Sequence, residues 1–307
     1  MTSDELAART RRATSAAAGA GSALGLRVTA PTVLYDVFSV VVHLAPEPVV
    51  VRVPTVLPRS LTADVQYAQQ QRELAVTGWL AAHGHPVVAP SPLVPTEPVR
   101  HDGFSMTFWQ LVAPIPGSDP TAEETGRHLA RLHTALAPCP LDLRFMVPLD
   151  ESVPDMLDQL HGRPDLLDPA DLTRARREWE ILAPVLTSPD ALSAAYPKAV
   201  VQPIHGDAPS HNVLHTLDGA LDSDFEHVGI GPVEWDLTFC GPDVIDAYDA
   251  AAARPADREL VAVLEAARMV QLVACFAMVP QLPMLAEGMR PALENWRTTP
   301  VAGGAAF

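Results

Sequence analysis

The sequence predicts an α+β fold in which a small, strand-rich N-terminal part precedes a larger, mainly helical part. Residues 26–54 cluster β-branched side chains between prolines, a pattern typical of strands in an antiparallel sheet. From Thr121 onward the apolar residues recur mainly at helical spacing. The chain has 307 residues, more than one hydrophobic core usually holds, so two lobes are expected.

The N-terminal elements follow from local patterns. Residues 1–18 carry charged side chains and no apolar core, so we expect a surface helix and not a secretory signal. After the strands of residues 26–54, residues 63–83 have a helical period that ends at Gly84 and Pro86. Two further strands should complete the sheet, near 87–90 and 104–111.

Helices are expected through most of the remaining chain. The lobe boundary is placed so that residues 1–110 form the N-terminal lobe and residues 111–307 the C-terminal lobe. Prolines, 31 in all, divide the loops and blur the ends of elements by several residues. The expected helices span 121–137, 151–160, 169–186, 256–279 and 284–296.

One segment carries residues suited to phosphoryl transfer. Asp207 is followed by Asn212 and, twelve residues later, by Asp224 in the sequence Asp224-Phe225-Glu226. A kinase must orient a hydroxyl toward a γ-phosphate while Mg²⁺ offsets the charge on the phosphate oxygens. Asp207 can orient the hydroxyl and accept its proton. Asn212 and Asp224 offer the hard oxygen ligands that Mg²⁺ prefers.

The flanking residues support this arrangement. Residues 200–204 are expected as a strand that enters the segment, and residues 212–215 as a strand that leaves it. Residues 216–219 form a predicted hairpin turn, because Asp218-Gly219 suits the positive φ angles of such turns. The hairpin would return the chain so that Asp224 lies beside Asn212.

These motifs resemble those of the aminoglycoside phosphotransferase and choline kinase group. That family carries HGDxxxxN, a short hairpin, a D-[FW]-[DE] segment and a WDL tripeptide, in this order. Here they correspond to residues 205–212, 224–226 and 235–237. The resemblance implies a protein-kinase-like bilobal fold with a small antiparallel-sheet N-terminal lobe and a larger helical C-terminal lobe.

The resemblance extends upstream and implies roles for further residues. Arg52, in a strand over 49–54, matches the cation that contacts nucleotide phosphates, and Glu73 matches its helical partner. The segment that contains Trp109, Gln110 and Leu111 matches the interlobe hinge, whose backbone contacts the adenine edge. Residues 126–133 match a packing helix of the C-terminal lobe, so the resemblance runs from about Pro48 to Gly241.

The chain departs from the family at three points. The turn between the first two strands, residues 35–39, contains no glycine, although it should cover the phosphates. Ala208 follows Asp207 where the family usually has a larger apolar residue, and Ser223 precedes Asp224 where an aliphatic residue is usual. Neither Ala208 nor Ser223 is a predicted ligand.

The resemblance implies a small-molecule O-phosphotransferase that uses Mg²⁺ and ATP or GTP. The net charge of −16 suits an amine-bearing acceptor, such as an aminoglycoside-like antibiotic, and would link the protein to antibiotic resistance. The acidity has a simpler explanation, a solvated acidic surface. It also makes non-specific nucleic-acid binding improbable, because phosphate backbones are bound by clustered Lys and Arg.

Two other functions stay open from the residues alone. One is a catalytically silent nucleotide-binding protein, suggested by the glycine-free turn. The other is a metal-dependent hydrolase, because imidazoles and carboxylates can hold zinc or two metal ions. Its ligands would come from His205, Asp207, His211 and His215.

Single residues also have simpler structural explanations. We expect His205 to hold the loop and Asp236 to accept backbone N–H groups as a buried carboxylate. Arg52 could be an exposed strand residue, and Trp109 could be a core aromatic. Glu226 fits either a metal or substrate ligand or a solvent-facing turn.

Composition bears on the protein's location. Three widely spaced cysteines without a CxxC pair argue against a disulfide framework and a zinc site. A reducing, cytoplasmic compartment is therefore expected.

The most apolar segment, residues 269–279, is followed by Pro280 and Pro283 and is shorter than a membrane helix, so no membrane association is expected. The sequence leaves the oligomeric state open.

Overall fold

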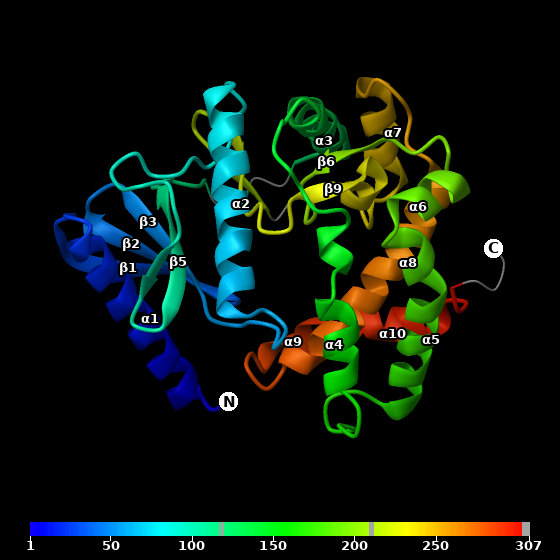
Figure 1. Ribbon diagram of the computed structural model, residues 1–307, viewed down its shortest axis with the longest axis horizontal. Coiled ribbons are helices and arrows are strands. Elements are labelled where there is room, and N and C mark those ends of the chain that lie inside the picture. The colour runs from blue at the N-terminus through cyan, green and yellow to red at the C-terminus, as the bar shows by residue number, and fades with distance from the viewer. Residues whose placement is uncertain (116, 118–119, 209–211, 303–307) are drawn as a thin grey trace.

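A small sheet lobe and a larger helical lobe lie side by side, as Figure 1 shows. This computed structural model describes residues 1–115, 117, 120–208 and 212–302. Five antiparallel strands form the sheet in the spatial order β1-β2-β3-β5-β4. The elements of this lobe are α1 (Ser3–Ala23), β1 (Val28–Asp36), β2 (Ser39–Pro46), β3 (Val49–Pro54), α2 (Ala63–Ala82), β4 (Val99–His101) and β5 (Phe104–Gln110).

Strand β3 has two different faces because its side chains alternate. Val49, Val51 and Val53 are buried in one cluster with the alanines of α1. Val50 belongs to a second cluster, with Leu74 of α2. By the same alternation Arg52 lies on the α2 side of the sheet, where the two lobes meet.

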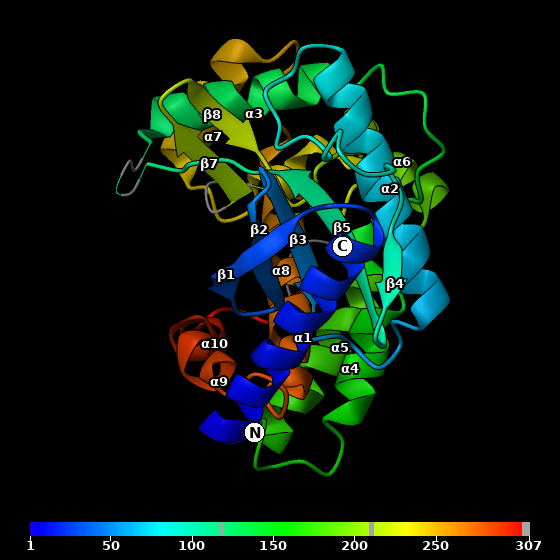
Figure 2. The same cartoon turned by 90° about the vertical axis from the view of Figure 1, so that its left-hand side faces the viewer.

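Helix α1 is more than the surface helix expected from the sequence. Its small side chains allow close packing, and the helix crosses one face of the sheet (Figure 2). A capping box between Thr2 and Glu5 fixes its first turn. The alanines buried against the sheet are Ala13, Ala16, Ala17 and Ala20.

The larger lobe is mainly helical and carries two short strand pairs. Strand β6 pairs with β9, and β7 forms a hairpin with β8. The first elements are α3 (Ala122–Leu136), η1 (Val147–Leu149), α4 (Ser152–Gln159), α5 (Pro169–Leu186), α6 (Pro189–Ala195), β6 (Val201–Ile204), β7 (Val213–Thr216) and β8 (Gly219–Asp222). The remaining elements are β9 (Gly229–Pro232), η3 (Val233–Leu237), α7 (Pro242–Ala251), α8 (Arg258–Ala274), η4 (Cys275–Met278), α9 (Met284–Gly288) and α10 (Arg290–Thr298).

The α+β fold is confirmed, with local corrections. The strand expected near residues 87–90 is not formed as an element, and only isolated bridges from Val87 and Pro90 occur there. The helix expected at 284–296 is two helices that meet at Met289. The last turn of the helix expected at 256–279 is a 3₁₀ turn. Among the described residues, six elements were not predicted: β4, α6, β9, α7 and the 3₁₀ helices η1 and η3.

In the part of the chain that the structure describes, one helical segment is apolar enough to cross a membrane by length and composition alone, contrary to expectation. It is Arg258–Met278, which comprises α8 and η4. Half of its most apolar window is buried inside the protein. The buried residues of α8, including Leu260 and Leu264, belong to the large core of the C-terminal lobe. In this structure α8 is a core helix.

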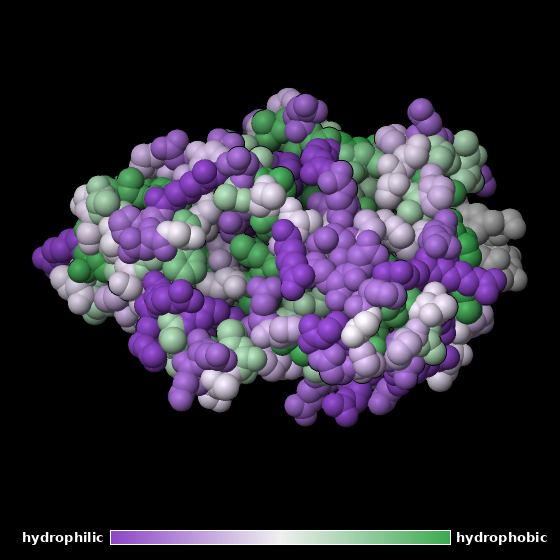
Figure 3. Space-filling view, turned by 60° about the horizontal axis from the view of Figure 1, so that its bottom comes forward, coloured by the Kyte–Doolittle hydropathy of each residue, from purple (hydrophilic) through white to green (hydrophobic). Residues whose placement is uncertain are grey.

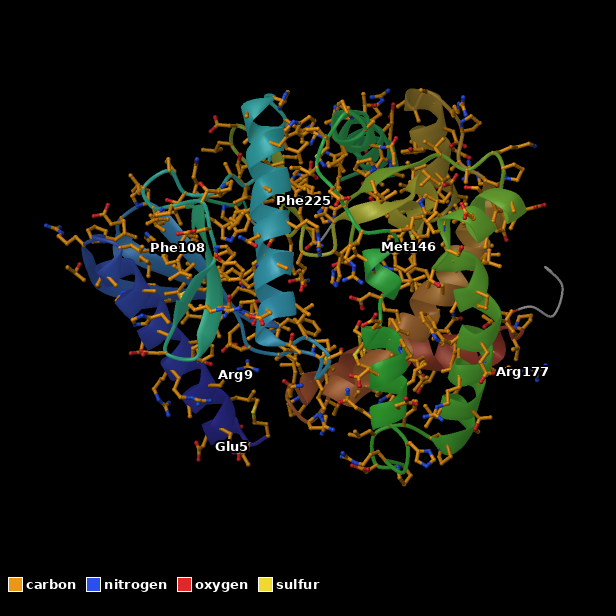
Figure 4. The ribbon with its side chains drawn as sticks, viewed as in Figure 1. Glu5, Arg9, Phe108, Met146, Arg177 and Phe225 are labelled. Carbon is orange, nitrogen blue, oxygen red and sulfur yellow. The ribbon has the colours of Figure 1, made fainter. Side chains whose placement is uncertain are left out.

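Helix α2 joins the two lobes. Its residues Val76 and Leu80 share a buried cluster with Leu132 of α3 and with Phe225. Figure 4 shows Phe225 beside α2, and Phe108 on the far side of that helix within the sheet lobe. A second contact pairs the Gln281 side-chain amide with the backbone N–H and C=O of Leu57. The lobes are therefore connected both beside the predicted active-site segment and beyond the end of β3.

The face in Figure 3 is mostly hydrophilic, and its hydrophobic residues form small separate patches, one of them in the hollow near the middle.

Candidate active site

A buried carboxylate holds the loop that follows β6. The backbone N–H groups of His205 and Gly206 donate to the two carboxylate oxygens of Asp236 over 2.8 and 2.9 Å. His133 Nε2 lies 3.0 Å from the same carboxylate. Burial alone would raise the pKa of Asp236, but the hydrogen bonds from His133 and the backbone hold it below its usual value. Asp236 therefore stays ionised and fixes the start of the loop, as predicted.

Glycine is required at position 206. Its φ is +86°, a conformation that side chains rarely adopt. A Cβ atom there would lie 2.1 Å from the backbone oxygen of His227. Trp235 Nε1 donates to the Gly206 carbonyl over 2.8 Å. The tight loop thus depends on Gly206 and on the Trp235-Asp236 pair of the WDL tripeptide.

His205 has the structural role that we expected. Its Nδ1 accepts from the backbone N–H of Asp207 over 3.2 Å, so Nε2 carries the proton and donates to the Ser223 carbonyl over 2.9 Å. The imidazole packs against the Phe225 ring, with centroids 4.3 Å apart. His205 therefore connects the loop to the segment that carries Asp224.

Asp207 and Asn212 face each other. Asn212 Nδ2 donates to the Asp207 carbonyl over 2.7 Å and to Asp207 Oδ2 over 3.1 Å. The other carboxylate oxygen, Oδ1, accepts from Arg268 Nη2 over 2.7 Å. Because the amide nitrogen of Asn212 points at Asp207, its amide oxygen points away and is available as a ligand.

The β7–β8 hairpin brings the third predicted residue to this place. The backbone N–H and the hydroxyl of Ser223 both donate to the Asn212 carbonyl over 2.9 Å. Asp224 follows directly, with a left-handed φ of +61° that is unusual for a residue other than glycine. The sequence separation between Asn212 and Asp224 thus becomes spatial proximity, as predicted.

Arg52 meets the C-terminal lobe at Asp224. Its Nη1 donates to Asp224 Oδ1 over 2.8 Å and to Glu226 Oε2 over 2.7 Å, and its Nη2 forms an ion pair with Glu73. The Arg52 side chain is only 11% exposed, so it is not a solvent-facing strand residue. One guanidinium therefore joins the sheet, α2 and the segment after β8.

The charges in this cluster influence one another. Burial lowers the pKa of Arg52, but Glu73, Asp224 and Glu226 more than offset this, so its pKa is raised. Burial raises the pKa of Asp224. The negative charges of Glu226 and Asp207 raise it further, whereas the positive charge of Arg52 lowers it. The positive charge of Arg52 therefore favours the ionised form of Asp224, and Glu226 and Asp207 disfavour it.

The oxygen donors of this cluster fit Mg²⁺. Asn212 supplies an amide oxygen. Asp224 and Glu226 supply carboxylate oxygens that already bind one cation, the Arg52 guanidinium. One or two carboxylates suffice for Mg²⁺, since nucleotide phosphates and water complete its octahedron. Asn212 and Asp224 would hold the metal, with Glu226, which shares an Arg52 nitrogen with Asp224, as a further candidate.

The hydrolase alternative finds little support in the described residues. Backbone groups occupy both ring nitrogens of His205. His211 lies outside the described residues. Within the described part of the chain, no three His, Cys, Asp or Glu side chains are grouped to hold one metal ion.

The predicted hinge residues lie at the end of β5. The Trp109 ring is buried with Val50 and Leu74, and its Nε1 donates to Thr107 Oγ1 over 2.8 Å. The backbone N–H of Gln110 donates to the Ala89 carbonyl, and that of Leu111 to the Pro48 carbonyl, both over 3.0 Å. Trp109 is thus a core aromatic. A nucleotide contact by the backbone of Trp109, Gln110 or Leu111 stays a prediction, and at Gln110 and Leu111 it would have to use groups other than these two N–H groups.

The glycine-free turn is anchored from outside the sheet. Asp36, at the end of β1, accepts from Arg9 Nη2 of α1 over 2.7 Å and also from the hydroxyl of Thr10. On the other side of the turn, the Phe38 carbonyl accepts from the backbone N–H groups of Thr55 and Val56. The turn is held by side-chain contacts with α1 and does not rely on glycine.

Two parts of the site were missed in the sequence. Arg268 stands in an apolar helical run 61 residues after Asp207, and nothing in the local sequence connects the two.

Asp222 is 2% exposed and lies between His85 Nε2, at 2.9 Å, and His128 Nε2, at 2.6 Å. Their hydrogen bonds outweigh burial and lower the pKa of Asp222 to about 2. A His-Asp-His cluster built from three separate segments has no sequence spacing to reveal it.

Comparison with known families agrees with this geometry. A profile described as the phosphotransferase enzyme family matches residues 40–270, which include the cluster from Arg52 to Asp236 and Arg268. The chain belongs to the phosphotransferase enzyme family. It is a small-molecule kinase of that family. No curated protein sequence matches this phosphotransferase significantly.

Solved structures share the fold of this phosphotransferase at low sequence identity. The choline kinase LicA from Streptococcus pneumoniae is 11% identical with a TM-score of 0.63, covering 90% of this chain and 96% of that one. The amicoumacin kinase hAmiN, in complex with AMP-PNP, Ca²⁺ and Ami, is 13% identical with a TM-score of 0.62 and 98% coverage of both chains. A GDP complex of an aminoglycoside 2′-phosphotransferase variant is 14% identical with a TM-score of 0.58, covering 90% of this chain and 94% of that one.

Proposed function

We propose that this kinase transfers the γ-phosphate of ATP or GTP to a hydroxyl group of a small, amine-bearing acceptor. One observation carries the proposal: Asp207, Asn212 and Asp224 converge from two segments next to the Arg52 guanidinium. This arrangement places a proton acceptor beside oxygen ligands and a cation, which are the parts that phosphoryl transfer requires.

Asp207 orients the acceptor hydroxyl. As the new bond forms between the hydroxyl oxygen and the γ-phosphorus, the bond from that phosphorus to the β,γ-bridging oxygen breaks and the nucleoside diphosphate leaves. The proton of the hydroxyl passes to the Asp207 carboxylate. Arg52, which stays paired with the buried Glu73, would contact the phosphates from β3.

Asn212 and Asp224 would hold Mg²⁺, which when bound offsets the negative charge on the phosphate oxygens. Glu226 is the third candidate ligand, because its carboxylate meets the same Arg52 nitrogen as Asp224 does. The proposed compartment is the cytoplasm, where nucleoside triphosphates are abundant.

The amine-bearing acceptor is supported by charge and by the names of related structures. A net charge of −16 favours the approach of cationic molecules. Choline and aminoglycosides, named in two of the matched structures, both carry positively charged nitrogen. An aminoglycoside-like antibiotic is therefore the first acceptor class to test, with drug resistance as its consequence in the cell.

The proposal is tested with the purified protein, Mg²⁺ and radiolabelled ATP or GTP. Label transfer is measured across aminoglycosides, choline, amino alcohols and uncharged sugar alcohols of similar size. We expect nucleotide-dependent transfer to one amine-bearing class and none to the uncharged sugar alcohols. Preferred transfer to uncharged acceptors would contradict the amine-bearing class, and no transfer to any compound would count against the function itself.

A further inference from the structure

Arg268 of α8 is a buried cation bonded to the proposed proton acceptor. Its side chain is 13% exposed, and its Nη2 donates to Asp207 Oδ1 over 2.7 Å. The other terminal nitrogen, Nη1, donates to Thr238 Oγ1 over 3.0 Å and contacts the Ala208 carbonyl at 3.4 Å. A charged group that is this buried persists only when its donors are bonded.

The surroundings of Arg268 fix its position. Its guanidinium carbon lies 5.5 Å from the centroid of the Trp235 ring, a cation–π contact. Trp235 also donates to Gly206, and Thr238 donates to the Trp235 carbonyl. Arg268 therefore rests on the same residues that hold the catalytic loop, and its planar fork cannot shift without breaking several contacts.

This contact decides how the Asp207 carboxylate is oriented. Oδ1 accepts from Arg268 and Oδ2 accepts from Asn212, so the two donors together fix the plane of the carboxylate. Each carboxylate oxygen can accept more than one hydrogen bond, so an acceptor hydroxyl can still approach. Because the carboxylate is held on both sides, its oxygens meet the acceptor hydroxyl in one fixed orientation.

We propose that Arg268 is a positioning residue that fixes the Asp207 carboxylate for attack by the acceptor hydroxyl, an inference that rests on the proposed phosphotransfer. Arg268 acts through Asp207 and not on the nucleotide, because its contacts are with Asp207 and the loop-holding residues. Its removal should therefore lower the rate of transfer while leaving Mg²⁺-nucleotide binding unchanged. Since a misplacement of about 1 Å can cost roughly 100-fold in rate, the expected loss in kcat is about 10- to 100-fold.

The test is a double-mutant cycle on kcat with Arg268→Ala, Asp207→Asn and the double variant. If Arg268 acts through Asp207, Arg268→Ala lowers kcat strongly in the wild-type background and changes it less than about twofold in the Asp207→Asn background. A residue that only supports the fold would cause the same loss in both backgrounds. Equal losses in the two backgrounds, or no loss in either, would overturn the inference.

Four further measurements separate positioning from folding. Guanidinium chloride at low concentration should restore part of the Arg268→Ala activity, and Arg268→Lys should lie between wild type and Arg268→Ala. The KM for the nucleotide should stay within about twofold of wild type, since the affected contact is not with the nucleotide. Loss of the thermal stabilisation by Mg²⁺ and nucleotide in Arg268→Ala would contradict the inference.

Arg258→Ala is the matched control. Arg258 lies at the start of the same helix and is ion-paired with Asp246 and Asp249, at 2.8 and 2.6 Å, and not with Asp207. This variant should keep wild-type kcat. If the wild type transfers phosphate to none of the acceptors, the proposed function is refuted, and the role of Arg268 with it. If the wild type is active and Arg268→Ala is equally active, only the role of Arg268 is refuted.

Discussion

Arg52 Nη1 donates to Asp224 Oδ1 over 2.8 Å and so joins strand β3 of the small lobe to the segment after β8 in the large lobe. The same nitrogen lies 2.7 Å from Glu226 Oε2. The guanidinium thus neutralises the carboxylates that we propose as Mg²⁺ ligands. When Mg²⁺ and nucleotide bind, we expect the metal to take over this charge and Arg52 to turn toward the phosphates while it stays paired with Glu73.

Asp224→Ala should abolish the rise in melting temperature that we expect Mg²⁺ and nucleotide to give the wild type, because it removes a proposed metal ligand. Glu226→Gln is the informative companion. If Glu226 only neutralises Arg52, this variant keeps the rise, and if it binds the metal, the rise shrinks. Melting curves with and without Mg²⁺ decide both points, and an undiminished rise in Asp224→Ala would remove Asp224 from the metal site.

Arg52→Met should destabilise the protein strongly, because it leaves the buried Glu73 carboxylate, 1% exposed, without its partner. The free energy of unfolding should fall by about 3 kcal/mol or more, measured by urea denaturation. Arg100→Met is the matched control in the same sheet, since its ion pair with Asp64 is exposed and should contribute less than about 1 kcal/mol. Similar losses in the two variants would show that the Arg52 cluster does not hold the lobes together.

Asp36→Ala should weaken nucleotide binding, because it frees the glycine-free turn from Arg9 and Thr10 of helix α1. The cost of ordering the released turn predicts a rise of roughly 3- to 10-fold in the KM for ATP or GTP. Asp64→Ala, which breaks an exposed ion pair with Arg100 in the same lobe, is the control and should leave the KM unchanged. An unchanged KM in Asp36→Ala would mean that α1 does not position this turn.

Asp222→Asn should cost stability in a pH-dependent way. The folded-state pKa of Asp222 is about 2, below the usual 3.8, so its stabilisation is present above pH 3.8 and is lost as the pH falls toward 2. At pH 7 the shift corresponds to about 2 kcal/mol of stability. Urea denaturation of wild type and variant from pH 7 down to pH 3 should show the difference shrinking, and a constant difference would contradict this origin.

The sequence predicted those parts of the site that lie in continuous motifs. Asp207, Asn212 and Asp224 could be placed together because a short hairpin separates them, and the Asp-Gly turn identifies that hairpin. The alternation of β3 is likewise local, so Arg52 could be placed in a strand. The α+β order of elements followed from the same local periodicities.

Other parts of the site depend on packing between distant segments. Arg268 reaches Asp207 only because α8 packs beneath the catalytic loop, and the anchoring of Asp36 by Arg9 depends on where α1 crosses the sheet. Helix α7 was missed because it is a short ten-residue segment. The length of the helix expected at residues 284–296 was wrong because the chain bends at Met289 between two short helices.

The most direct test of the central claim compares wild type with Asp207→Asn in a single-turnover transfer assay, using the acceptor found by the screen and saturating Mg²⁺-nucleotide. The account predicts a rate of transfer lower by roughly 100-fold or more, with the thermal stabilisation by Mg²⁺ and nucleotide unchanged, because Asp207 contacts the hydroxyl and not the nucleotide. Equal rates of transfer in the two proteins would contradict the account, since Asp207 would then have no part in the reaction.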